Sequence, residues 1–251
     1  DFLDEIGLKK TDRFVCLIVR DDSYKEQVQS WINKDWSYHS YRNSDINIYQ
    51  DALYALAKKG YWCIRMGKAV KTPCTTNHPR IIDYAVSKYR SDFLDMWLMS
   101  KCFLTVSTGT GLDEVSRIFR KPIVFVNFIP LLHLASYSHC ITVPKCLVWT
   151  DTKESLILSE YLDHSFLRTE KYKNAKIEYV DLSPEEIKLA VLEMESRLNG
   201  NWQDSEENIQ LQDQFWKIFR SHENFQKYHG WINSKSQIGA HFLQKNQVFL
   251  N

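Results

Sequence analysis

Residues 102–127 read CFLTVSTGTGLDEVSRIFRKPIVFVN, and their pattern is the strongest indication of the fold class. The apolar run Cys102–Val106 predicts a strand, and the small residues Ser107–Gly111 predict a turn after it. Residues 112–119 have helical periodicity, and a second apolar run, Ile123–Val126, follows directly after a proline. The expected apolar face of the helix is Leu112, Val115, Ser116 and Phe119. Strand, turn, helix and strand in this order are typical of α/β proteins with a parallel sheet.

The turn has the composition of an anion-binding loop. Gly109 and Gly111 allow the backbone to approach a ligand closely, and unpaired N–H groups at a helix start attract phosphate. We expect Ser107, Thr108 and Thr110 to line the same site, and a side chain at Gly111 to block it. The pattern is neither G-x-G-x-x-G nor a Walker loop, since no Lys-Ser or Lys-Thr pair follows Gly111. A tight turn without a ligand has the same composition, so both interpretations stand.

Strand-like and helix-like segments also alternate in the first hundred residues. Continuous apolar runs predict buried parallel strands, and apolar residues at 3.6-residue spacing predict helices between them. The predicted strands are Phe14–Val19, Tyr61–Ile64 and Ile81–Tyr84, and the predicted helices are Asp45–Lys59, Ser91–Lys101 and a short one near Glu26–Ile32. The apolar faces of the two longer helices are Ile48, Tyr49, Ala52, Leu53, Leu56 and Ala57, and Phe93, Leu94, Trp97 and Leu98. This alternation implies right-handed crossovers between parallel strands.

Apolar periodicity is weaker in the second half of the chain. The elements expected there are a last strand at Ile177–Val180 and helices after Ser183, at Ser205–Phe219 and at Ile238–Leu250. Ser183 is typical of a helix cap, because Pro184 fits the first turn and Glu186 completes a capping box. We therefore expect a Rossmann-like α/β domain at residues 1–200 and a C-terminal helical extension, residues 201–251, that packs back on it.

Composition limits the classes of partner. The chain has 251 residues and 44% hydrophobic content, which suits one large α/β domain. Its 32 Lys and Arg residues are nearly balanced by 31 Asp and Glu residues, so nothing indicates a nucleic-acid-binding protein. No apolar run approaches the ~18 residues of a membrane-spanning helix, which leaves at most peripheral contact with a membrane.

Six cysteines occur without C-x-x-C spacing. This pattern favours buried reduced thiols in a cytoplasmic protein over a zinc site. Asp21 and Asp22 are adjacent, which is not the D-x-D spacing of a metal-binding carboxylate pair. We therefore expect no metal ion.

The ends of three predicted strands carry residues suited to a diphosphate. Arg20 follows the first strand, Arg65 and Gly67 follow the second, and Ser107–Gly111 follows the fourth. In an open parallel sheet these carboxyl ends border one crevice, where ligands bind. Guanidinium groups bind phosphate in a bidentate manner and stay charged in a partly dry site. An isolated arginine at a strand end is more often part of a surface ion pair.

Acidic residues and one histidine near this crevice are candidates for binding and catalysis. Glu114 could accept hydrogen bonds from ribose hydroxyls, whereas we expect Asp113 to point outward and only complement the helix dipole. His39, Asp22 or Asp45 could act as a general base on a sugar hydroxyl. For Asp45 the simpler interpretation is that it caps the following helix.

The chain resembles a known family along most of its length. The matching segments are VRDDSY (19–24), HSYRNSDINIYQDAL (39–53), GYWCIRMGK (60–68), IIDYA (81–85), RSDFLDMWLMSK (90–101), STGTGLDEVSRIFRKPIVFVN (107–127), FLRTEKY (166–172), SPEEIKLAVLEMESRLNG (183–200), LQDQFWKIF (211–219) and IGAHFLQKN (238–246). Together they resemble a family of bacterial glycosyltransferases linked with the synthesis of surface polysaccharides.

The resemblance implies the nucleotide-binding half of a metal-independent GT-B glycosyltransferase. The layout is also similar to that of GDP-fucose-dependent fucosyltransferases, in which an H-x-R arginine corresponds to Arg20 and a late Ser/Thr turn to Ser107–Gly111. Ile18 stands where that pattern has histidine, so the resemblance does not extend to the donor sugar. It implies a nucleotide-sugar donor as substrate with no other cofactor, and a glycan or lipid-linked acceptor. It also implies an acceptor-binding half that is missing, reduced or supplied by upstream sequence. Two other classes stay open: a GT-B-like sugar-nucleotide epimerase and a non-catalytic sugar-nucleotide-binding module.

Overall fold

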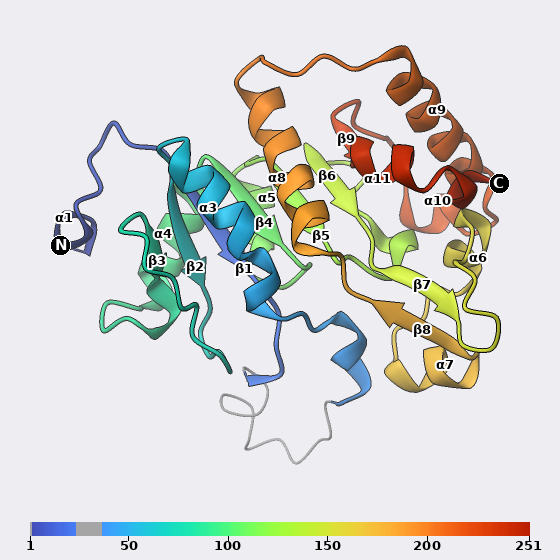
Figure 1. Ribbon diagram of the computed structural model, residues 1–251, viewed down its shortest axis with the longest axis horizontal. Helices are drawn as coiled ribbons and strands as arrows, with labels where there is room; N and C mark the ends of the chain where they lie inside the picture. Colours follow the sequence, from blue (N-terminus) through green and yellow to red (C-terminus); the bar gives the residue numbers. More distant parts are fainter. Residues whose placement is uncertain (1, 24–36) are drawn as a thin grey trace.

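The computed structural model describes residues 2–23 and 37–251 (Figure 1). The helix expected near Glu26–Ile32 lies outside the described residues. A seven-stranded parallel sheet forms the centre of the molecule. Its strands are β1 (Phe14–Ile18), β2 (Trp62–Met66), β3 (Ile81–Asp83), β4 (Leu104–Ser107), β5 (Ile123–Val126), β6 (Cys140–Val143) and β9 (Ser236–Ile238). The predicted α/β class with a parallel sheet is confirmed.

The strands lie in the order β3-β2-β1-β4-β5-β6-β9, and every neighbouring pair is parallel. The first six follow the strand order of Rossmann-type sheets. The order reverses between β1 and β4, where Ile18 lies opposite Ser107 in the register. In such a sheet the crevice beyond the carboxyl ends of these two strands is the expected ligand site.

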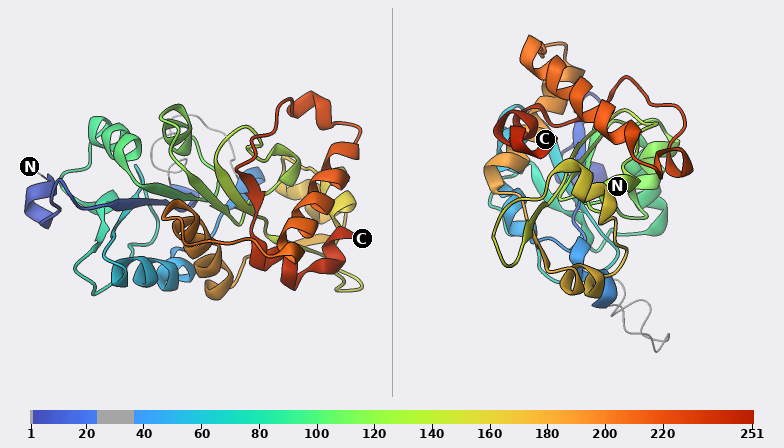
Figure 2. Two further views of the ribbon diagram at one scale, coloured as in Figure 1. Left: turned by 90° about the horizontal axis from the view of Figure 1, so that it is seen from above. Right: turned by 90° about the vertical axis from the view of Figure 1, so that its right-hand side faces the viewer.

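Helices cover both faces of the sheet (Figures 1 and 2). The helices are α1 (Phe2–Ile6), α3 (Gln50–Lys58), α4 (Asp92–Lys101), α5 (Asp113–Ile118), α6 (Leu158–Asp163), α7 (Thr169–Asn174), α8 (Pro184–Leu198), α9 (Glu206–Ser221), α10 (Phe225–Tyr228) and α11 (Ala240–Lys245). Short 3-10 helices are η1 (Ser37–Arg42), η2 (Ile46–Tyr49), η3 (Tyr84–Val86), η4 (Leu131–His133) and η5 (Gln247–Leu250). Strand β1 shows the division of the core: Val15 and Leu17 belong to the cluster on the α3–α8 side, whereas Cys16 and Ile18 face α4. Alternate residues of a strand point to opposite faces, so both faces of this apolar strand are buried.

Most predicted helix starts are confirmed. Ser91, Ser183 and Ser205 each cap a helix through the side-chain oxygen, and Ser183 forms the expected capping box with Glu186. Two predicted core positions are wrong: Phe93 and Phe119 are 78% and 53% exposed. Helix α5 ends at Ile118, before the turn that would bury the second phenylalanine.

The C-terminal half differs most from expectation. Ile177–Val180 is a strand (β8), but it pairs antiparallel with β7 (Cys146–Trp149) in a separate two-stranded sheet. The helix predicted over Ile238–Leu250 is confirmed only for Ala240–Lys245 (α11), since Ile238 ends strand β9 and Gln247–Leu250 forms η5. The C-terminal segment is therefore not purely helical, because β9 pairs with β6 and completes the main sheet.

The six cysteines are free, and five of them are buried. Three lie in strands of the main sheet, namely Cys16, Cys63 and Cys140. Burial raises the pKa of the Cys63 thiol to about 12, so this group is protonated at neutral pH. These thiols pack as small apolar side chains.

Candidate functional site

The loops after β1 and β4 are joined at the switch point of the sheet. The Arg20 backbone N–H donates to Thr108 Oγ1 at 3.0 Å, and the Thr108 N–H donates to the Ile18 carbonyl at 3.3 Å. The structure therefore brings Arg20 and the Ser107–Gly111 turn together, as the sequence predicted. Thr108 is buried, and its side-chain oxygen holds this junction by accepting from the Arg20 N–H.

The Arg20 guanidinium is half-buried and incompletely bonded. Its Nε and Nη2 atoms are buried and have no hydrogen-bond partner among residues 2–23 and 37–251. Burial lowers the pKa of Arg20, and the nearby charge of Arg42 lowers it further, while Asp22 and Asp21 act in the opposite direction. Buried donors without partners are uncommon in folded proteins and call for an explanation. An anion bound here would both satisfy the donors and offset the repulsion between the two arginines.

Arg42 is the second arginine of the crevice, and it was not among the residues predicted to bind phosphate. Its Nη2 donates to the Gly109 carbonyl, and the adjoining loop is fixed to the first strand end because the Ser44 N–H donates to the Arg20 carbonyl at 3.0 Å. The signal in the sequence was its place in the polar, aromatic loop after the first strand. Only the fold brings this loop against the turn that follows β4.

The turn itself is bonded internally. Ser107 Oγ donates to Asp113 Oδ2 at 2.6 Å and accepts from the Gly109 N–H at 3.0 Å. The Thr110 N–H donates to the same carboxylate oxygen at 2.5 Å. Asp113 is fully buried, so the expectation that it points outward is wrong. Burial raises its pKa, while the bonds from Ser107 and Thr110 act in the opposite direction. The Gly109 and Thr110 amides are thus satisfied by the protein and are not free donors for a phosphate.

Gly109 rather than Gly111 is the glycine that this turn requires. Gly109 has φ +80°, and a Cβ there would lie 2.8 Å from Phe128 Cε2. A Cβ on Gly111 would meet nothing within 4 Å, and its backbone is not left-handed. The prediction that a side chain at Gly111 would block the site is therefore not supported by the local geometry, whereas the left-handed conformation at Gly109 favours glycine.

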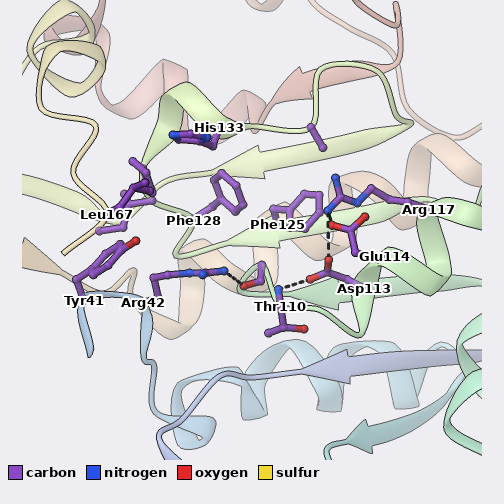
Figure 3. A pocket seen from close by; sticks show the side chains of 14 residues that line it. Tyr41, Arg42, Thr110, Asp113, Glu114, Arg117, Phe125, Phe128, His133 and Leu167 are labelled. Carbon is purple, nitrogen blue, oxygen red and sulfur yellow. Dashed lines mark hydrogen bonds and ion pairs between the residues drawn. The ribbon is translucent and has the colours of Figure 1, made fainter. Parts of the chain in front are cut away.

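A pocket of about 250 Å³ opens beside the turn (Figure 3). Phe125 and Phe128 form part of its wall, and Arg42 enters from the η1 side. Glu114 lies at the other end, where its half-exposed carboxylate pairs with Arg117. The combination of aromatic walls and a few polar groups is typical of small-molecule sites. Glu114 is thus placed where a ligand hydroxyl could reach it.

Arg65 and Gly67 are not part of this crevice surface. Arg65 is 2% exposed; its Nη1 donates to Asp83 Oδ1 at 3.2 Å and its Nη2 to the Thr72 carbonyl at 3.2 Å. The prediction that Arg65 neutralises a diphosphate is wrong, because its charge is already paired inside the protein. At Gly67 a Cβ would lie 2.7 Å from Val70 Cγ1, so the glycine serves the fold of its own loop.

The three candidate bases lie in different environments. Asp22 is half-buried: Oδ2 accepts from Asn43 Nδ2 at 2.6 Å, and Oδ1 is buried without a partner in the described chain. Asp45 caps η2, since Oδ1 accepts from the Asn47 N–H at 3.0 Å. His39 lies in η1, with its ring 4.0 Å from that of Tyr38. Of the three, Asp22 lies two residues after Arg20 and has a buried carboxylate oxygen without a partner among the described residues.

A buried polar network holds the Arg42 loop in place. Lys145 is 2% exposed, and its Nζ lies 2.5 Å from Asp181 Oδ1 and donates to the Asn43 carbonyl at 2.6 Å. Ser44 Oγ donates to Asp181 Oδ2 at 2.6 Å, and Asn127 Nδ2 donates to Ser44 Oγ at 3.1 Å. Residues from four separate segments are thereby fixed around one ammonium group. This support was not predicted from the sequence.

Within residues 2–23 and 37–251, no three His, Cys, Asp or Glu side chains are grouped so that they could hold a metal ion. In the same part of the chain, no helix has the length and apolar character needed to cross a bilayer.

Comparisons of the chain with family models, with curated proteins and with solved structures gave no match.

Proposed function

We propose that this chain is the donor-binding domain of a GT-B-type glycosyltransferase that transfers a sugar from a nucleotide-sugar to a glycan or lipid-linked acceptor. The observation that carries the proposal is the pair Arg20 and Arg42 at the switch point of the sheet. Arg20 has two buried donor atoms without partners among residues 2–23 and 37–251, and the positive charges of Arg20 and Arg42 repel each other. A diphosphate would satisfy both requirements, because guanidinium groups bind phosphate oxygens strongly in partly buried sites.

In the proposed mechanism, Arg20 and Arg42 stabilise the nucleoside diphosphate as the leaving group. As the glycosidic bond to the nucleoside diphosphate breaks, negative charge accumulates on the phosphate oxygens, and fixed cations stabilise that charge. Arg20 would contact the diphosphate through Nε and Nη2. The pocket beside the turn would take another part of the donor, with Glu114 accepting hydrogen bonds from its hydroxyl groups. Asp22 is the proposed base for the acceptor hydroxyl, since Oδ1 has no partner among the described residues.

Arg20→Ala is expected to weaken the binding of a nucleoside diphosphate by roughly tenfold to a hundredfold, which corresponds to the loss of a charge-assisted phosphate contact of about 1.5–3 kcal/mol. Binding of the nucleoside without phosphates should change much less. A thermal-shift screen against nucleoside diphosphates and sugar nucleotides selects the ligand, since a ligand at about 100 times its Kd stabilises by about 2.7 kcal/mol. Calorimetry then compares the parent with the variant.

Arg220→Ala is the matched control, because this arginine is exposed on α9. It should bind the diphosphate as the parent does. An equal loss of diphosphate and nucleoside binding in Arg20→Ala would argue against a phosphate contact and for a structural role.

Diphosphate binding is expected to persist after treatment with EDTA, because positive side chains supply the charge in the proposed site. Calorimetry with and without the chelator measures this directly. Loss of binding in EDTA, with recovery on addition of magnesium or manganese, would contradict the metal-independent scheme.

Two alternatives are tested by product analysis. A sugar-nucleotide epimerase would convert the donor without an acceptor, and a transferase would slowly hydrolyse it. A non-catalytic binding module would leave it unchanged. The binding module has one observation in its favour: the Asp45 carboxylate, one of the candidate bases, is engaged as a helix cap.

A further inference from the structure

Basic residues are concentrated at the edge of the sheet opposite the candidate site. Because all seven strands are parallel, their amino ends meet at one edge. We define the basic edge as the cations in the segments that lead into these strands. They are Lys9, Lys10, Arg13, Lys58, Lys59, Arg80, Lys101, Arg120, Lys121 and Lys235. Lys59 is paired with Glu195, and Asp12 lies between Lys10 and Arg13, so the basic edge carries an excess of cations in a chain whose net charge is only +1.

A hollow of about 380 Å³ lies within the basic edge, between the segments before β1, β4 and β5. Four cations line it: Arg13, Lys101, Arg120 and Lys121. Asp12 is the one carboxylate among its lining residues, and its Oδ2 already accepts from the Lys9 N–H at 3.0 Å and from Trp62 Nε1 at 3.1 Å. The hollow therefore presents an excess of positive charge.

The charges at its rim are not neutralised within the described part of the chain. Lys101, Arg120 and Lys121 form no ion pair with any residue of 2–23 or 37–251. Two large exposed apolar side chains adjoin Arg120 and Lys121 in the chain: Phe119, which lines the hollow, is 53% exposed, and Ile118, the last residue of α5, is 73% exposed. Such a surface can bind anionic groups through its cations and apolar groups through its exposed apolar side chains.

We propose that the basic edge binds the surface of an anionic lipid bilayer. The cations would contact lipid phosphates, the hollow would hold one headgroup, and Ile118 and Phe119 would enter the boundary between headgroups and acyl chains. Peripheral proteins bind membranes through this combination of basic and apolar groups, with about 1 kcal/mol from each Lys or Arg near the surface. An acidic protein or a nucleic acid would match the charge but would leave the two apolar side chains without a role. This proposal does not depend on the transferase activity.

The test is co-sedimentation of the chain with vesicles of phosphatidylcholine alone and of equal parts phosphatidylcholine and phosphatidylglycerol. We expect binding to the anionic vesicles only, and weaker binding at high salt. The triple variant Lys101→Gln, Arg120→Gln, Lys121→Gln should lower the partition coefficient roughly a hundredfold, from three charges at about 1 kcal/mol each. Ile118→Ser should lower it roughly tenfold through the lost apolar insertion.

The control variant carries the same number of substitutions on exposed lysines elsewhere, Lys171→Gln, Lys173→Gln and Lys217→Gln. It should bind vesicles like the parent, and all variants should keep the melting temperature of the parent. Equal losses in the two triple variants, or no binding to anionic vesicles, would overturn the proposal. The proposal would also be overturned if inorganic phosphate, at the same concentration as the lipid headgroups, released the protein from the vesicles. That result would indicate a site for free phosphate. Binding of a single-stranded oligonucleotide without vesicle binding would instead identify a nucleic-acid surface.

Discussion

Lys145→Met is expected to lower the free energy of unfolding by about 3 kcal/mol, because removing one partner of a buried ion pair leaves the other partly uncompensated. Lys145 is 2% exposed and its partner Asp181 is 29% exposed, so the effect should fall at the lower end of the range for buried pairs. The Asn43 carbonyl also loses its donor. Chemical denaturation of the parent and the variant measures the difference.

Two further variants identify the cause. Lys68→Met removes an exposed pair with Asp92, in which the side chains are 40% and 75% exposed, and should leave the denaturation midpoint nearly unchanged. The double variant Lys145→Met, Asp181→Leu should recover part of the loss, since it removes both charges. A single variant as stable as the parent would show that the ammonium does not hold these segments together.

Gly109→Ala is expected to destabilise the fold by about 2–4 kcal/mol. A side chain at φ +80° costs about 1–2 kcal/mol, and displacement of the Phe128 ring from the new Cβ adds a packing cost of similar size. Because the Gly109 carbonyl accepts from Arg42, the shift should also weaken diphosphate binding. Thermal melting reports the stability, and calorimetry with the diphosphate reports the site.

Gly111→Ala is the matched control two residues away. Its Cβ meets open space and its backbone is not left-handed, so the expected change in stability is small, with a gain of about 0.4–1 kcal/mol from the restricted unfolded chain. If the two alanine variants melted alike, the left-handed turn at Gly109 would not be a constraint on the fold.

The sequence predicted the first half of the sheet because its strands are short, continuous apolar runs bounded by polar loops. The runs at β1, β2, β3, β4 and β5 have no competing periodicity, and Ser91 and Ser183 mark helix starts by a local hydrogen bond. Local chemistry of this kind does not depend on distant contacts. Strand β9 was missed because its sequence, Ser-Gln-Ile, contains a single apolar residue and so forms no apolar run. Strand β6 was missed although it is as long as β4 and β5.

The candidate site was predicted in part. The position of Arg20 at a strand end and the turn after β4 follow from the order of elements alone, since parallel strands share one carboxyl edge. The sequence could not show that Arg65 would meet Asp83, or that Arg42 would reach Gly109 across 67 residues. Both outcomes depend on which loops the sheet order brings together.

Three properties can be predicted from the chain alone: the α/β class, the parallel pairing implied by alternating strands and helices, and the junction at which the first and fourth strands end. These properties arise from apolar periodicity and from residues that bond to near neighbours. Which charged groups have partners depends on contacts between distant segments of the fold. Arg65 is ion-paired with Asp83, and Asp113 accepts from Ser107, although each keeps one buried polar atom without a hydrogen-bond partner among the described residues; Arg20 keeps two such donors, Nε and Nη2. The availability of a charge depends on what packs against it, and packing partners distant in the chain leave no local pattern in the sequence.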